Sequence, residues 1–280
     1  MKKQIASITL FGDKKPLLIA IKILKVKVKI LNIITSENNL EIQNFCQKNK
    51  INFFDYKSIS KMNRTNKILI MKTDFALSFS YPYKISSKFI KFFKNKIYNF
   101  HPADLPFYRG NLPTTWPILD NKKFAYYTLH LITIHFDQGP IISKVRIKIG
   151  KFDTGISLYK KLLERLPDLV LKNINKLINS SFKFRYQDEK KSKFYKNKIP
   201  NNGFISSNWE GKYIERFVRA FYSRSKEPAR TILDNHLYKL YEVKFKKKIS
   251  SFINDKKIFF KCPDGYVIFE KYKKIKLNNK

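Results

Sequence analysis

Cysteine is scarce in this chain of 280 residues, which contains only Cys46 and Cys262. Two cysteines are too few for the disulfide framework of a small secreted protein, so we expect free thiols and a cytoplasmic location. The sequence also lacks any apolar run of about 18 residues, the length that a membrane-spanning helix needs. The short run at residues 5–11 stops at Gly12 and is typical of a strand and turn, not of a signal peptide. We therefore predict no insertion into a membrane.

The glycine-rich loops that hold nucleotide phosphates are also missing. No GxGxxG follows the first apolar run, and neither GxxxxGKS nor GxxxxGKT occurs in the sequence. These absences argue against a dinucleotide site and against a P-loop. The four histidines and two cysteines show no spacing typical of metal ligands. We therefore expect no metal cofactor.

Acidic residues are few, since 58 Lys and Arg face 21 Asp and Glu and the formal net charge is +37. Such an excess is typical of nucleic-acid-binding proteins. However, 49 of the basic residues are Lys and only 9 are Arg, the better bidentate partner of phosphate. The charge is also dispersed, because residues 191–280 carry 23 basic and 8 acidic residues and residues 1–190 carry 35 and 13. We interpret it as a solvated surface that suits a phosphate-bearing substrate, and a polyanion site stays open as the alternative.

Hydrophobic residues make up 43% of the chain, too many for a disordered protein. In the first half they predict strands at 5–11, 28–35, 51–56, 74–80 and 97–100, with helices at 16–24, 39–48 and 86–93. This alternation predicts an α/β fold with a Rossmann-like, mostly parallel sheet and helices on both faces. Ligands bind such sheets at the carboxyl ends of the strands. The segments 80–85 and 101–110 are therefore where we expect a site.

The second half predicts two further strands and a separate small domain. Strands are expected at 128–134 and 141–149, and a long helix at 156–178 that is interrupted or kinked at Pro167. Further along, a helix at 211–222 and strand-like runs around a Pro263-Asp264-Gly265 turn predict a mostly-β, OB-like unit. We therefore expect a Rossmann-like domain over residues 1–186, a polar linker over 187–203 and a small β-rich domain over 204–280.

Three polar residues stand where chemistry is expected. Asn99 and His101 end the fifth strand and point to the same side of it, because side chains alternate along a strand. Asp137 lies in the turn between the later strands, close to Gly139, which permits a close backbone approach. When an amine attacks a carbonyl, an amide and a protonated imidazole can donate hydrogen bonds to the oxyanion. A carboxylate can orient the imidazole or a water and accept the amine proton, so the trio predicts acyl transfer without a covalent intermediate.

The same segments resemble the folate-dependent formyltransferase family. The shared pattern is Asn99-Phe100-His101-Pro102, Leu105-Pro106-Phe107-Tyr108-Arg109-Gly110, Thr128-Leu129-His130 and Asp137-Gln138-Gly139-Pro140. The resemblance covers about residues 1–180. Trp209, residues 217–221 and Asp264-Gly265 also resemble the C-terminal domain of members that act on amino sugars or methionyl-tRNA. The resemblance implies that Asn99, His101 and Asp137 are the catalytic residues.

The resemblance also implies a co-substrate, 10-formyltetrahydrofolate. The family holds its pterin with the loop after the fourth strand and the loop before the catalytic Asp. The matching residues are Tyr83, Lys84, Ile85, Thr133, Ile134, His135 and Phe136, with Asn111 as another folate contact. This sequence departs from the family pattern at Ala103, where Ser is usual, and at Phe136.

Three hypotheses about function are compatible with the resemblance. Thr128-Leu129-His130 is similar to the sugar-nucleotide members, and the basic insertion of methionyl-tRNA enzymes after the first strand is missing. We therefore predict formylation of a nucleotide-linked amino sugar, as in lipopolysaccharide or surface-glycan biosynthesis, by a chain compatible with a homodimer. The net charge of +37 favours tRNA as the alternative acceptor. A third hypothesis is a non-catalytic RNA-binding or scaffold protein on the same fold.

Overall fold

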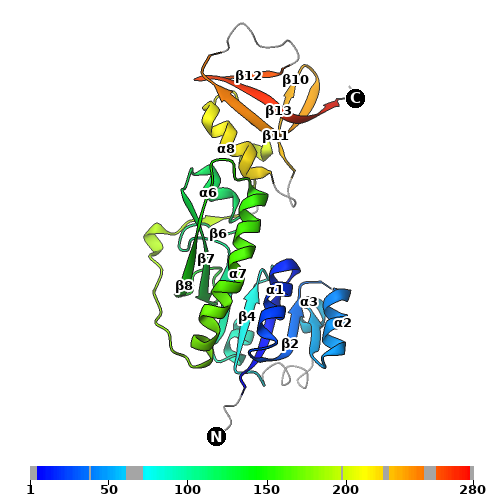
Figure 1. Cartoon of the computed structure of the whole chain (residues 1–280), viewed down its shortest axis with the longest axis vertical. Coiled ribbons are helices and arrows are strands. Elements are labelled where there is room, and N and C mark those ends of the chain that lie inside the picture. The colour runs from blue at the N-terminus through cyan, green and yellow to red at the C-terminus, as the bar shows by residue number, and fades with distance from the viewer. Residues whose placement is uncertain are drawn as a thin grey trace. The chain divides into compact units, whose positions relative to one another are not determined.

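The computed structural model describes residues 5–37, 39–60, 72–196, 198–222, 227–248 and 257–277 (Figure 1). Within these residues the larger sheet has seven strands in the order β3-β2-β1-β4-β5-β7-β8. The strands are β1 (Ser7–Gly12), β2 (Lys29–Thr35), β3 (Asn52–Asp55), β4 (Phe75–Phe79), β5 (Ile97–His101), β7 (Phe124–Leu131) and β8 (Ile141–Lys148). The helices up to β8 in the described residues are α1 (Lys14–Leu24), α2 (Leu40–Lys48), α3 (Tyr56–Ser60), α5 (Ser87–Phe92) and α6 (Thr115–Leu119). The predicted α/β fold is confirmed.

The strand order places the candidate site. β1 lies between β2 and β4 and is parallel to both, and β5 continues the parallel series beside β4. From β1 the chain therefore adds β2 and β3 on one side. It then crosses back and adds β4 and β5 on the other side of β1. Because crossovers between parallel strands are right-handed, α1 and α2 cover one face and α5 the other. Such a reversal opens a crevice at the carboxyl ends of the strands, where β5 ends in His101.

β7 is antiparallel to β5 and pairs His130 with Asn99. It covers Phe124–Leu131, so the predicted strand at 128–134 is correct in type but ends too late. Residues 132–140 form a loop instead, and Leu131 N donates to Pro140 O over 3.0 Å to close it. The apolar letters at 132 and 134 suggested a longer strand, but Ile134 is 50% exposed and has left the core.

After β8 the chain continues into a long helix and, further along, a short strand. Helix α7 (Gly155–Ile178) runs through Pro167 without interruption, so of the predicted interruption or kink the interruption is wrong. Its buried leucines recur with helical spacing, at Leu158, Leu162, Leu166 and Leu169. Beyond it, β9 (Phe194–Tyr195) pairs with β6 (Arg109–Gly110), a short ladder that the sequence did not predict. The predicted linker thus contributes to the loop that follows β5.

A smaller antiparallel sheet has the order β10-β11-β13-β12. Its strands are β10 (Ala229–Leu233), β11 (His236–Lys246), β12 (Phe259–Cys262) and β13 (Gly265–Lys276). Helix α8 (Gly211–Phe221) contacts β11 and buries one apolar face. Cys262 pairs with Gly265, so Pro263 and Asp264 form the predicted hairpin turn. The predicted β-rich C-terminal part is therefore confirmed.

The chain divides into two compact units. The first comprises residues 1–110, 126–146 and 162–194, and the second comprises residues 111–125, 147–161 and 195–280. Every candidate site residue except Asn111 belongs to the first unit. The boundaries at 187 and 203 stay a prediction, although 3-10 turns at Glu189–Lys191 and Pro200–Gly203 show local order in that stretch.

Candidate active site

β5 ends in two of the predicted site residues. His101 is buried, with 8% of its surface exposed, and Asn99 is half-buried. Both point to one side of the sheet, while the apolar Phe100 points to the other. Opposite His101, Thr128 donates from its hydroxyl to Ala103 O over 2.6 Å and fixes the chain as it leaves the strand.

Asp137 reaches the same place from the β7–β8 loop. Its Oδ2 lies 3.6 Å from His101 Nε2 and accepts a hydrogen bond of 2.9 Å from the Gly110 amide. Its Oδ1 lies 3.6 Å from His130 Nε2. A Cβ at Gly139 would overlap the Leu131 carbonyl oxygen, so glycine is needed for this close approach. The structure thus brings His101 and Asp137 together, from positions 36 residues apart in the sequence.

His130 connects Asn99 to this pair. Its Nδ1 lies 2.8 Å from Leu131 O, and a carbonyl only accepts, so Nδ1 carries a proton. Burial lowers the pKa of His130 to about 4, so the ring is neutral at pH 7 and its Nε2 is an acceptor. Asn99 Nδ2 lies 3.2 Å from this Nε2 and donates to it. Among the described residues, the second hydrogen on Asn99 Nδ2 has no acceptor.

The carboxyl group of Asp137 is held in its charged form. Burial by itself would raise its pKa, but His101, His130 and the Gly110 amide outweigh burial and lower the pKa below the ordinary 3.8. Nε2 of His101 is buried and has no hydrogen-bond partner within the described part of the chain. A charged carboxylate therefore lies beside a buried imidazole nitrogen that makes no hydrogen bond to the described residues.

This arrangement is supported by two residues that no sequence pattern singled out, Gln187 and Glu189. Arg109 is buried, with 2% of its surface exposed, and its guanidinium contacts the side chains of Gln187 and Glu189. Gln187 in turn donates to the backbone of the Asp137 loop. No spacing in the sequence pointed to this, because residues 187 and 189 lie in a stretch predicted as a linker.

The predicted folate residues after β4 lie beside an aromatic cavity. Tyr83 stacks on Tyr56 with ring centroids 3.9 Å apart, Ile85 is buried, and Lys84 is exposed. The cavity has a volume of about 270 Å³. It is lined by Phe11, Tyr56, Ile59, Tyr81, Lys84, Ile85, Ser86, Lys88, Phe89 and Phe92. Aromatic walls with lysines among them suit a planar ring that carries an anionic tail.

The predicted folate residues before Asp137 are largely exposed. Ile134 and Phe136 are 50% and 47% exposed, His135 is exposed, and Thr133 donates from its hydroxyl to His135 O over 3.2 Å. The side chains of Ile134 and Phe136 thus expose apolar surface to water, which is unfavourable. Asn111 follows Gly110 in the chain and is exposed in the second unit.

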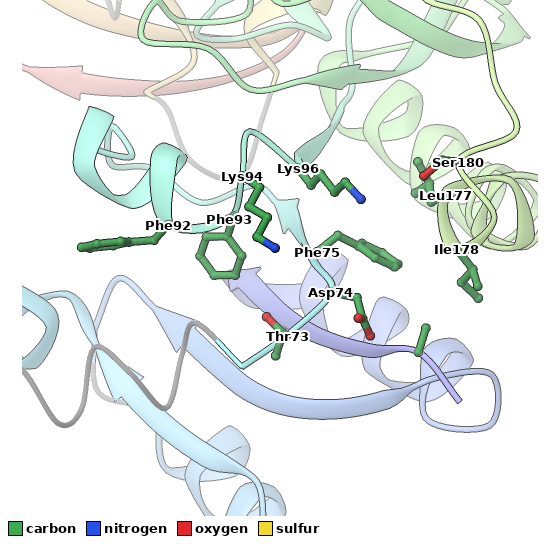
Figure 2. A pocket seen from close by; sticks show the side chains of 11 residues that line it. Thr73, Asp74, Phe75, Phe92, Phe93, Lys94, Lys96, Leu177, Ile178 and Ser180 are labelled. Atoms are coloured by element: carbon green, nitrogen blue, oxygen red, sulfur yellow. The ribbon is translucent and has the colours of Figure 1, made fainter. Parts of the chain in front are cut away.

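A second cavity of about 380 Å³ opens at the amino ends of β1, β4 and β5 (Figure 2). Asp74 and Lys96 line it, together with Ile178 from the end of α7. None of the predicted site residues lines this cavity. It lies at the amino ends of the strands, whereas His101 lies at the carboxyl end of β5. In the described ranges, no group of three or more His, Cys, Asp and Glu could hold a metal ion. No helix there is long and apolar enough to span a bilayer.

Comparison with known proteins supplies a family. The sequence pattern described as Formyl transferase matches residues 17–174, more than half of the chain. The GDP-perosamine N-formyltransferase of Brucella melitensis is 29% identical over 165 residues, which cover 59% of this chain and 63% of that protein. The chain spans 32% and 63% of the length of the first two curated relatives that it matches.

Two solved structures resemble the whole chain. WlaRD, a sugar 3N-formyl transferase crystallised with dTDP and 5-N-formyl-THF, has a TM-score of 0.74 and 21% identity over 98% of this chain and 99% of its own. The N-formyltransferase of Helicobacter canadensis, in complex with folinic acid and dTDP-3-aminofucose, has a TM-score of 0.70 and 19% identity over 96% and 100%. At these identities the likeness shows the fold.

Proposed function

The chain belongs to the formyl transferase family, and we propose that it transfers a formyl group from 10-formyltetrahydrofolate to the amine of a nucleotide-linked amino sugar. The observation that carries this proposal is the buried contact between His101 and Asp137, 3.6 Å apart at the carboxyl end of β5. Asn99 joins it through His130. A non-catalytic protein on this fold would not need a charged carboxylate held against a buried imidazole, because burying a charge is costly.

Each residue of the trio has a defined part in the reaction. As the amine attacks, negative charge develops on the formyl oxygen, and Asn99 Nδ2 and protonated His101 donate to it. Asp137 accepts the proton that the amine loses, directly or through His101. The new bond joins the amine nitrogen to the formyl carbon, and the bond from that carbon to the donor nitrogen breaks. The proton released by the amine balances the one that the leaving nitrogen gains.

The folate donor supplies the activated formyl group, and two sets of residues fit it. The exposed side chains of Ile134 and Phe136 and the aromatic cavity beside Ile85 offer apolar surface for a ring system. Lys84 and Lys88 line the same cavity and can pair with the carboxylates of a glutamate tail. The proposal also includes the predicted folate contacts of Tyr83, Asn111, Thr133 and His135.

A nucleotide-linked amino sugar is the acceptor that the relatives favour. The Brucella relative is named for GDP-perosamine, and both solved structures contain dTDP or a dTDP-sugar. The basic surface also suits a pyrophosphate. Methionyl-tRNA is the competing acceptor, and the charge of +37 is the observation behind it.

The test is a competition between acceptors. The full chain is given 10-formyltetrahydrofolate with dTDP-3-aminofucose, GDP-perosamine or initiator methionyl-tRNA, and formyl incorporation is followed by mass spectrometry. We expect turnover with at least one sugar nucleotide and none with tRNA. Turnover with tRNA alone would replace the acceptor, and no turnover with any acceptor in a wider panel of amino sugars would contradict the proposal.

A further inference from the structure

Gln187 joins the loop that carries Asp137 to a buried arginine. Its Nε2 donates to the backbone oxygens of Asp137 (2.8 Å) and Gly139 (2.7 Å). Its Oε1 accepts from Nε (3.2 Å) and Nη2 (2.8 Å) of Arg109. Both hydrogens of the amide nitrogen and its oxygen are therefore used. Only a carboxamide can do this, because a carboxylate has no donor for the two carbonyls and an amine has no acceptor for the guanidinium.

Arg109 is itself firmly anchored. Its Nη1 and Nη2 each donate to Glu189 over 2.8 Å, and its side chain is 3% exposed. Four guanidinium hydrogen bonds go to Gln187 and Glu189, so little of the group is left for a substrate phosphate. In the backbone, Arg109 N donates to Lys193 O over 3.0 Å. The bidentate pair thus ties residues 187–193 to the end of the loop after β5.

The same arginine supports Asp137 from two directions. Through Gln187 it holds the Asp137 backbone, and the next residue in the chain, Gly110, donates its amide to Asp137 Oδ2 over 2.9 Å. Asp137 has a φ of 55°, a left-handed conformation that only a minority of non-glycine residues adopt. A backbone of this kind keeps its conformation only when its surroundings enforce it. The two hydrogen bonds from Gln187 supply that enforcement.

We propose that Gln187 is a positioning residue of the reaction, with Arg109 and Glu189 as its anchors. It holds the loop so that the Asp137 carboxylate faces His101 Nε2 at 3.6 Å. Gln187 does not touch the reacting atoms and acts only through Asp137. This inference rests on the proposed function, since it needs Asp137 to handle the proton of the amine.

The first test compares two changes at one position. Gln187→Ala removes all four hydrogen bonds, and Gln187→Glu keeps the shape but loses both donors. With whichever of dTDP-3-aminofucose and GDP-perosamine gives the higher turnover, we expect kcat to fall about 10- to 100-fold in both variants. KM for the acceptor should change by less than about threefold, because ground-state binding is untouched. Gln43→Ala, on the exposed side of α2, is the matched control and should behave as wild type.

A milder variant protects the test against misfolding. Glu189→Gln keeps one acceptor oxygen for Arg109, replaces the other with an amide donor and removes the charge, and we expect a fall in kcat of about three- to tenfold with an unchanged melting temperature. A kcat within about twofold of wild type in Gln187→Glu and Glu189→Gln, both folded, would overturn the proposal.

A double-mutant cycle separates positioning from a general structural role. Because Gln187 acts through Asp137, adding Gln187→Ala to Asp137→Asn should lower kcat no further. Losses that multiply would mean that Gln187 supports the fold elsewhere and would overturn the proposal. The cycle also separates two failures. Full activity of Asp137→Asn would contradict the proposed function, whereas an inactive Asp137→Asn beside an active Gln187→Ala would contradict only the positioning role.

Discussion

Asn99 on β5 lies directly opposite His130 on β7, and its side-chain amide donates to His130 Nε2 over 3.2 Å. The proton on Nδ1 of His130 is held by Leu131 O, 2.8 Å away. Nε2 is therefore the acceptor nitrogen of the His130 ring. Because the Asn99 amide donates to this nitrogen, the ring sets the direction of the amide. Two neighbouring strands thereby set the orientation of the group that we expect to stabilise the oxyanion.

Removing this acceptor should slow the reaction. His130→Phe fills the same space but leaves Asn99 without its partner, and we expect kcat to fall about 10- to 100-fold because the amide loses its orientation. Steady-state kinetics with the best sugar-nucleotide acceptor measure the change. His236→Phe, in the second unit, is the matched control and should retain wild-type kcat. An unchanged kcat in His130→Phe would show that Asn99 needs no such support.

The buried imidazole of His130 should also make stability depend on pH. Its pKa is about 4 in the folded chain, against the ordinary 6.5. Below pH 6.5 the unfolded chain therefore binds a proton that the folded chain does not, and the free energy of unfolding falls as the pH drops from 6.5 to 4. The loss is at most about 3 kcal/mol.

Denaturant unfolding at pH 7 and at pH 4.5 measures this loss. His130→Gln removes the titrating group, so the free energy of unfolding of wild type should fall by up to about 3 kcal/mol more than that of the variant. Parallel pH dependence in the two proteins would contradict the lowered pKa of His130.

The approach of the Asp137 loop depends on Gly139. A Cβ there would overlap the Leu131 carbonyl oxygen, so Gly139→Ala must push the loop away from β7. We expect a loss of about 1–3 kcal/mol in the free energy of unfolding, together with a lower kcat. Chemical denaturation and kinetics on the same preparation test both. A fully active and equally stable variant would show that the loop is not held this closely.

Phe136 should contribute to folate binding through its exposed ring. Phe136→Asn removes apolar contact area, and we expect the Kd for folinic acid to rise about fivefold, as for a loss of about 1 kcal/mol. Isothermal titration calorimetry gives this value. Phe152, which is 80% exposed in the second unit, provides the matched control as Phe152→Asn. Equal Kd values of the two variants for folinic acid would show that residue 136 does not contact the folate.

The sequence was informative about the fold where its pattern was local. Strands such as β1 and β4 are buried apolar runs, and α2 begins where Asn39 can accept from Ile42 N, as it does over 3.1 Å. The predicted end of β7 was wrong because apolar residues continue beyond Leu131 into the loop that leads to β8. Pro167 did not end α7, since its buried leucines continue on both sides.

The site was predictable only in part. Asn99 and His101 share one strand, so alternation was enough to place them on the same side. The contacts of His130 and Gln187 depend on the pairing of β5 with β7 and on a segment about 50 residues beyond Asp137. No local pattern encodes such contacts, because they arise from the tertiary fold. The motif after β5 includes Arg109, but its pattern gave no sign that the guanidinium binds the side chains of Gln187 and Glu189.

The central claim is that Asn99, His101 and Asp137 perform formyl transfer. The most direct measurement is the single-turnover rate of transfer from 10-formyltetrahydrofolate to the best sugar-nucleotide acceptor in Asn99→Ala, His101→Ala and Asp137→Asn, with melting temperatures recorded beside it. We predict that each change lowers the rate by about 100-fold or more while the melting temperature stays close to that of wild type. Rates near the wild-type value in all three folded variants would contradict the account.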